Sequence, residues 1–139
     1  MFNVFRSVNV KLTEEEIKMM NSLSLAHVGD GVFELFVRTR INNGRTNSHK
    51  LHILASKIVK ASSQAVYLEK IESLLTDEEL GVINRARNSK LHTIPKNATL
   101  KDYRNAIAFE ALFGYLYLMG RDDRMLEIYD FIGVGNDES

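Results

Sequence analysis

The chain of 139 residues has no cysteine, no tryptophan and a single proline, Pro95. The lack of cysteine excludes disulfide bonds and thiolate metal sites and suits a reducing compartment, so we expect a cytoplasmic protein. The N-terminus lacks the basic start, apolar stretch and small-residue cleavage site of a secretory leader. The longest apolar run, residues 106–119, is too short to span a bilayer and contains an acid, so we expect no membrane partner.

Strand-like alternation of apolar and polar residues is also missing, whereas helical spacing of apolar residues recurs along the chain. We therefore predict an all-α fold in a single domain over residues 13–132. An irregular lead-in over residues 1–12 and a flexible tail over residues 133–139 should flank this domain.

Several helix boundaries are indicated by local chemistry. Thr13 with Glu16, and Thr76 with Glu79, have the capping-box spacing that satisfies free amides at a helix start. Apolar spacing predicts helices over about 24–42, from 48 onward, over 66–75 and over 99–119. The helix over 66–75 is either separate from the preceding one or continuous with it. Asp122 should cap a last helix that reaches Phe131.

Two acidic residues occur within apolar segments, where burying a charged side chain is energetically unfavourable. Glu110 lies in the apolar run, and Asp30 lies between Gly29 and Gly31 within an apolar helix. A lone buried carboxylate is costly, and two of them on two apolar helices suit one shared divalent cation such as magnesium. The flanking glycines would let a large group approach the backbone. The alternative is that each acid is solvated at the edge of an apolar face or paired with arginine, as Glu34 can pair with Arg38.

A loop without helical periodicity, residues 87–98, lies inside a basic stretch in which Asp102 is the single acid. Although formal net charge is +0, a local cluster of Arg, Lys and Asn side chains can neutralise and hydrogen-bond phosphates. A plain solvated loop is the alternative. The candidate RNA-binding residues are Arg85, Arg87, Asn88, Lys90, Lys96, Asn97 and Arg104.

Other chemistries find no support. His27, His49, His52 and His92 lack zinc-ligand spacing, and no GxSxG, Walker or GxGxxG motif occurs. We therefore expect ordinary solvated histidines and no nucleotide cofactor.

The segment Leu25-Ala26-His27-Val28-Gly29-Asp30-Gly31-Val32-Phe33-Glu34 resembles the first signature of the ribonuclease III family, and residues 108–118, with Phe109-Glu110-Ala111-Leu112, resemble the second. The basic stretch, Leu51-His52 and Ser63-Gln64-Ala65 are similar to the Mini branch of that family, which lacks a double-stranded-RNA-binding domain. The resemblance covers about residues 20–120. Ala26 and Ile107 stand where ribonuclease III proper has further acids, so the number of metal ions is open.

The resemblance implies a ribonuclease III endonuclease-like helical bundle that forms a homodimer. It implies hydrolysis of double-stranded RNA with Mg²⁺, for which Mn²⁺ can substitute, leaving 5′-phosphate and 3′-hydroxyl ends. Asp30 and Glu110 would be the catalytic metal ligands. The implied substrate is the precursor of 23S ribosomal RNA, with a ribosomal protein or pre-ribosomal particle as a further partner. A catalytically silent RNA-binding module and a structural helical adaptor are the alternatives.

Overall fold

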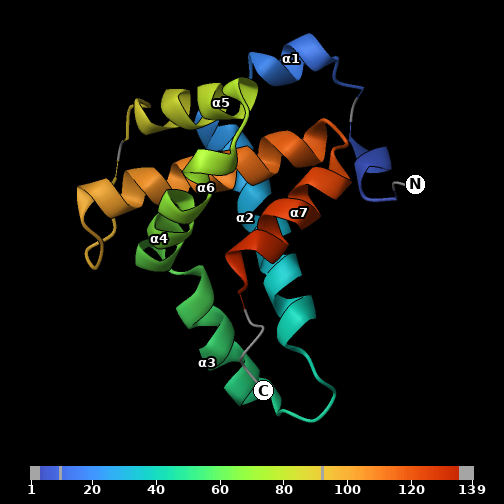
Figure 1. Cartoon of the computed structure of the whole chain (residues 1–139), viewed down its shortest axis with the longest axis vertical. Helices are drawn as coiled ribbons and strands as arrows, with labels where there is room; N and C mark the ends of the chain where they lie inside the picture. The colour runs from blue at the N-terminus through green and yellow to red at the C-terminus, as the bar shows by residue number, and fades with distance from the viewer. Residues whose placement is uncertain (1–3, 10, 92, 135–139) are drawn as a thin grey trace.

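A computed structural model describes residues 4–9, 11–91 and 93–134, and these ranges contain helices but no strand. The all-α, single-domain prediction is confirmed (Figure 1). The elements are η1 (Arg6–Val8), α1 (Glu14–Lys18), α2 (Ser22–Ile41), α3 (Ser48–Val59), α4 (Ala61–Ile71), η2 (Glu72–Leu74), α5 (Asp77–Arg87), α6 (Leu100–Leu118) and α7 (Asp122–Ile132).

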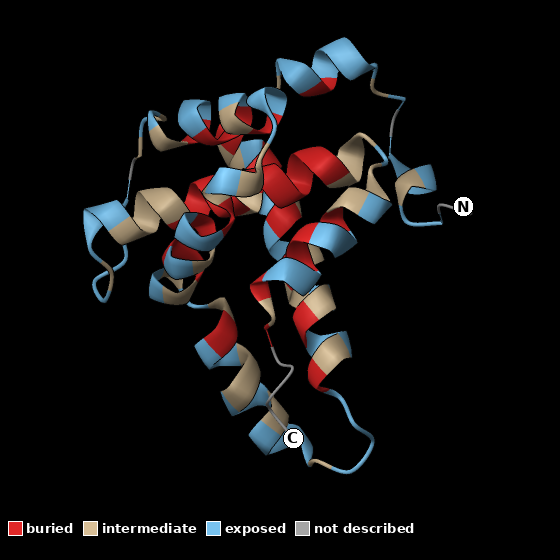
Figure 2. Cartoon of the chain, in the orientation of Figure 1, coloured by how far each residue is buried: buried red, intermediate tan, exposed pale blue. Residues whose placement is uncertain are grey.

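Helix α6 is the centre of the fold. It packs against α2, α4, α5 and α7, with its most extensive contact to α2. Figure 2 shows that buried residues concentrate along α6 and on the faces turned toward it. A helix that is apolar on nearly all sides is stable in water when other helices cover it, which explains this central position.

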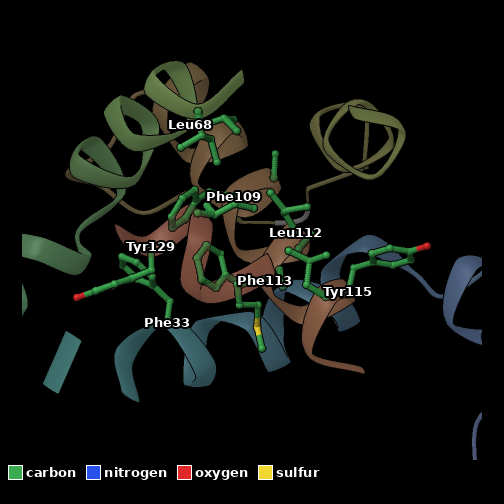
Figure 3. Packing of buried hydrophobic residues seen from close by; sticks show 14 of the residues in the cluster. Phe33, Leu68, Phe109, Leu112, Phe113, Tyr115 and Tyr129 are labelled. Atoms are coloured by element: carbon green, nitrogen blue, oxygen red, sulfur yellow. The ribbon is translucent and has the colours of Figure 1, made fainter. Parts of the chain in front are cut away.

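An aromatic cluster joins α6 to α2 and α7 (Figure 3). The ring of Phe33 lies 5.0 Å from that of Phe109 at 89° and 5.4 Å from that of Phe113. Phe36 stacks on Tyr129 of α7 at 5.0 Å. Each fully buried ring contributes roughly 2–3 kcal/mol through burial, so the cluster fixes the position of α6 against α2.

Both predicted capping boxes are present, with Glu16 and Glu79 accepting from the backbone amides of Thr13 and Thr76. The predicted cap by Asp122 is wrong. Arg121 is the N-cap residue without a side-chain cap, and the Asp122 carboxylate instead accepts 2.6 Å hydrogen bonds from the Arg6 guanidinium.

The chain turns at Lys60, whose extended backbone (φ −64°, ψ 157°) separates α3 from α4. The last turns of α2, the connecting loop and α3, residues 38–60, project from the body of the molecule, and most of their surface is exposed (Figures 1 and 2). We call this region the arm.

The ends of the chain differ from a simple lead-in and tail. The lead-in includes the 3-10 turn η1, and Val134 is buried after the left-handed Gly133. Residues 1–3, 10 and 135–139, which belong to the expected lead-in and tail, lie outside the described residues. Within the described ranges, no helix combines the length and hydropathy needed to cross a bilayer.

Candidate active site

The site is built at the point where α2 and α6 cross. A Cβ atom at Gly29 would lie 1.7 Å from the backbone oxygen of Glu110 and 2.7 Å from the nitrogen of Gly114. A Cβ at Gly114 would lie 1.9 Å from the backbone oxygen of Leu25. Glycine at both positions therefore lets the two backbones touch. The group that approaches the backbone at Gly29 is helix α6. At Gly31, by contrast, an added Cβ would meet no heavy atom within 4 Å.

This crossing brings the two acids together. Asp30 follows Gly29 directly, and its carboxylate is close enough to hydrogen-bond the carboxyl group of Glu110. Asp30 is exposed, while Glu110 is half-buried, so the pair lies where the helix interface opens to solvent. The sequence suggests two buried acids, but one of them faces water.

The electrostatics of the pair follow from this placement. Burial, the charge of Asp30 and the hydrogen bond with Asp30, in that order, raise the pKa of Glu110 to about 8. The Gln64 hydrogen bond opposes this increase, and the charge of Glu34 adds to it. Two carboxyl groups in contact cannot both ionise easily, so without a cation the pair retains one proton at neutral pH.

The donor set fits a hard divalent cation. Carboxylate oxygens are the ligands that Mg²⁺ takes together with retained water, and a cation would relieve the repulsion that raises the pKa of Glu110. Ala26 and Ile107 are buried at 5% and 4% exposure and supply no oxygen. In the described part of the chain, no group of three or more His, Cys, Asp and Glu side chains could hold a metal. The site therefore offers two carboxylates.

Two neighbours complete the surroundings of the acids. Glu34 is ion-paired with Arg38 at 3.3 Å, the surface pair that the i,i+4 spacing allowed. Gln64 of α4 is buried and donates from Nε2 to the Oε2 of Glu110 at 3.4 Å. Sequence reasoning did not identify Gln64 as a site residue, because nothing in Ser62-Ser63-Gln64 indicates that α4 meets α6 here.

The candidate RNA-binding residues fall into two groups. Arg87 donates to Asn105 at 2.8 Å and pairs with Glu72, and Arg104 donates to the carbonyls of Arg87 and Ser89 at 2.8 and 3.0 Å. These two arginines tie the loop to α5 and α6. The other five candidates are exposed, namely Arg85, Asn88, Lys90, Lys96 and Asn97.

The arm is a second basic surface that sequence reasoning missed. The sequence contains no Asp or Glu between Glu34 and Glu69, and this long acid-free stretch was the available signal. The exposed basic residues of the arm are Arg38, Arg45, Lys50, Lys57 and Lys60. His49 and His52 are also exposed there, and His92 lies outside the described residues.

Comparison with known proteins identifies the family of the chain. The family model described as "Ribonuclease III domain" matches residues 23–121. The chain is 42% identical over 124 residues to a Mini-ribonuclease 3 of Clostridium tetani, covering 88% of this chain and 82% of that protein. It is 44% identical over 119 residues to one of Desulfitobacterium hafniense, covering 82% and 75%. A crystal structure of a protein from Fusobacterium nucleatum aligns with a TM-score of 0.76 at 29% identity, covering 81% and 92%.

The family match over residues 23–121 spans the acid crossing, α4, α5 and the basic loop. The chain belongs to the ribonuclease III family, in its Mini-ribonuclease 3 branch. Membership of this family supports an endoribonuclease.

Proposed function

We propose that the chain is a magnesium-dependent endoribonuclease that hydrolyses phosphodiester bonds of double-stranded RNA, leaving 5′-phosphate and 3′-hydroxyl ends. The observation that carries this proposal is the contact between the carboxyl groups of Asp30 and Glu110 at the α2–α6 crossing. Both acids would ligate Mg²⁺, and Mn²⁺ suits the same oxygen donors.

The residues of the chain have distinct tasks in this proposal. The bound cation would supply polarisation of the scissile phosphate and a lowered pKa for the attacking water. Asp30 holds its carboxylate at the solvent-exposed edge, where a phosphate can reach it, and Glu110 would lose its proton to solvent in order to act as the second ligand. Gly29 and Gly114 keep the two ligands at one fixed distance because they set the crossing of their helices.

Incubation of the pure protein with a duplex RNA tests this function. Cleavage is expected with Mg²⁺ or Mn²⁺ and is expected to stop with EDTA. Asp30→Asn should lower the cleavage rate by about 10³-fold or more, since the loss of a charged ligand removes most of the metal site. Cleavage that persists in Asp30→Asn at the wild-type rate would contradict the proposal.

Double-stranded RNA would lie across the two basic surfaces. Duplex RNA is recognised mainly by shape, through phosphates and 2′-hydroxyls. The exposed residues of the 85–97 segment and the arm would supply donors to the phosphates, while the buried Gln64 of α4 contacts Glu110 of the acid pair. Arg87 and Arg104 contribute by holding the loop in place.

A second copy of the chain would cover the apolar groove of about 940 Å³ between α2, α7 and the N-terminal segment. Phe5, Leu35 and Leu126 line this groove and are 66%, 55% and 48% exposed. Such a contiguous apolar surface favours association, and a dimer would extend the RNA contact along a duplex. Sedimentation should show a wild-type dimer, a Leu35→Glu monomer, and a dimer for Met19→Glu, which changes an exposed apolar residue outside the groove. A monomeric wild type would contradict this part of the proposal.

The proposed substrate is the precursor of 23S ribosomal RNA in the cytoplasm, with a ribosomal protein or pre-ribosomal particle as the assisting partner. This assignment rests on the resemblance to the Mini branch. Primer extension on precursor RNA treated with the protein should reveal discrete new ends that are absent with Asp30→Asn. Equal cutting of unrelated duplexes would indicate a nuclease without this preference.

A catalytically silent RNA-binding module is the second candidate, and the buried, apolar Ala26 and Ile107 favour it because they reduce the carboxylate set. This candidate predicts tight duplex binding by the wild type without cleavage in Mg²⁺ or Mn²⁺. A structural adaptor predicts no salt-dependent RNA binding at all, and it gives the Asp30–Glu110 contact no purpose.

A further inference from the structure

Gln64 is an unusual residue for the interior of this protein. It lies in the second turn of α4 and is 1% exposed. Within the described ranges, its Oε1 atom is buried and has no hydrogen-bond partner. A buried polar atom without a partner is unfavourable, so a methionine of similar volume would fill the space better if filling were the task of this side chain.

The amide nitrogen of Gln64 has two acceptors. Nε2 donates to the backbone oxygen of Val59 at 2.9 Å and to Oε2 of Glu110 at 3.4 Å. A carbonyl and a carboxylate both need a donor, so this pair of partners determines which end of the amide faces them. One NH₂ group thus connects the end of α3 with Glu110, the half-buried acid of the candidate metal site.

Three side chains of α4 donate hydrogen bonds to backbone carbonyl groups at the end of α3. The hydroxyl of Ser63 donates to the carbonyl oxygen of Lys57 at 2.8 Å, and the hydroxyl of Tyr67 donates to that of Ile58 at 3.0 Å. Gln64 donates to the carbonyl oxygen of Val59. These bonds satisfy carbonyl groups that the break at Lys60 leaves without helical partners. Gln64 also donates to Glu110.

A carboxylate at the end of a glutamate side chain has a broad terminal torsion, so packing of the stem does not fix its orientation. A hydrogen bond to one oxygen restricts this rotation. We propose that Gln64 is a positioning residue, which orients the carboxylate of Glu110 for divalent metal binding and connects it to the junction between the arm and α4. This inference rests on the proposed function, because the orientation of Glu110 matters where that residue binds a cation.

The test compares Gln64→Met with Ser63→Ala in the full chain. Both variants remove one hydrogen bond to the end of α3, but only Gln64→Met removes the bond to Glu110. Titration calorimetry with Mn²⁺ alone, thermal unfolding in EDTA, and kcat and KM for a duplex RNA are measured for each. We expect Gln64→Met to weaken Mn²⁺ binding and lower kcat by about 10- to 100-fold, the usual effect of losing a hydrogen bond to a metal ligand. KM should stay within about twofold, since Gln64 is buried and does not face the RNA.

Ser63→Ala should keep Mn²⁺ affinity and kcat within about twofold of wild type, while its unfolding temperature in EDTA falls because the bond to the Lys57 carbonyl is lost. Gln64→Asn, which keeps the amide but is one methylene shorter and cannot reach both acceptors, should also lose Mn²⁺ affinity, and it serves if Gln64→Met does not fold. Wild-type Mn²⁺ affinity in both Gln64 variants would overturn the inference, as would an equal loss in Ser63→Ala. A wild type that neither binds Mn²⁺ nor cleaves would instead overturn the proposed function.

Discussion

The acid pair and the basic surfaces of this protein are positioned in opposite ways. Asp30 and Glu110 stand on two helices whose backbones touch at Gly29 and Gly114, beneath a core of packed aromatic rings. The exposed basic residues stand on the 85–97 segment and on the projecting arm, where most of the surface faces solvent. Chemistry at a metal requires ligands held to a fraction of an ångström, whereas attraction of a polyanion tolerates mobile charges.

This difference predicts how each region responds to substitution. Changes at the crossing should act through geometry, with large and specific effects. Changes on the basic surfaces should act through charge, with small effects that depend on salt.

The largest effect is expected for Gly29→Ala. Its Cβ would meet the Glu110 backbone oxygen at 1.7 Å, so the helices must separate. We expect a loss of about 3 kcal/mol or more in the free energy of unfolding and a loss of RNA cleavage. Gly81→Ala is the matched control, because a Cβ at this exposed position of α5 meets nothing within 4 Å and should stabilise the helix by up to about 1 kcal/mol. Urea unfolding measures both, and equal stabilities of the two variants would contradict the close crossing.

The second effect is a pH-dependent stability difference between wild type and Glu110→Gln in EDTA. The pKa of Glu110 is raised from 4.5 to about 8 in the folded chain, so the folded state binds a proton that the unfolded state releases between these values. The free energy of unfolding of the wild type should therefore fall as pH rises from about 4.5 to about 8. The Glu110→Gln variant should not show this fall, because glutamine does not ionise. We expect Glu110→Gln to gain up to about 4 kcal/mol relative to wild type between pH 5 and pH 8.5, since each pH unit over which the extra proton is bound corresponds to about 1.4 kcal/mol. A stability difference that is constant with pH would argue against the raised pKa of Glu110.

The third effect is a pH dependence of metal affinity, which arises because the metal and the proton of Glu110 compete for the same carboxylate. Binding of Mn²⁺ or Mg²⁺ through both carboxylates must displace the proton of Glu110, so affinity should rise by up to about tenfold per pH unit between pH 6 and pH 7.5. Calorimetry at pH 7 in buffers with different ionisation enthalpies should record release of about one proton per metal ion. Metal binding without proton release would place the cation elsewhere.

The smallest effect concerns the basic loop. Lys90→Gln with Lys96→Gln should weaken duplex RNA binding by about 3- to 10-fold at low salt and reduce the slope of log affinity against log salt by about 1 to 2. Lys11→Gln with Lys18→Gln removes the same charge from exposed residues before and within α1 and should leave affinity nearly unchanged. An equal loss in both double variants, measured by fluorescence anisotropy, would indicate that net charge rather than the loop attracts RNA.

Local chemistry in the sequence predicted much of the fold. Capping boxes at Thr13 and Thr76 and the apolar spacing of α2 and α6 depend on near neighbours, and the structure confirms them. The break at Lys60 was left open, since it contains neither glycine nor proline and depends on hydrogen bonds from Ser63, Gln64 and Tyr67. The predicted Asp122 cap failed because Arg6, distant in sequence, binds that carboxylate.

The sequence predicted the two acids of the candidate site but not the residues around them, for a related reason. The family signatures singled out Asp30 and Glu110, and their contact depends on two glycines whose purpose no single helix reveals. Gln64 and the arm were missed, because burial beside Glu110 and projection from the body are tertiary properties. Their roles in metal and RNA binding stay predictions.

A crystal structure of the protein soaked with Mn²⁺, with anomalous diffraction recorded at the manganese edge, tests the central claim most directly. We predict an anomalous peak between the carboxylates of Asp30 and Glu110, within about 2.0–2.4 Å of an oxygen of each, and its loss in Asp30→Asn crystals. A peak at other residues, or a peak that survives Asp30→Asn, would contradict the claim that the α2–α6 crossing builds the metal site.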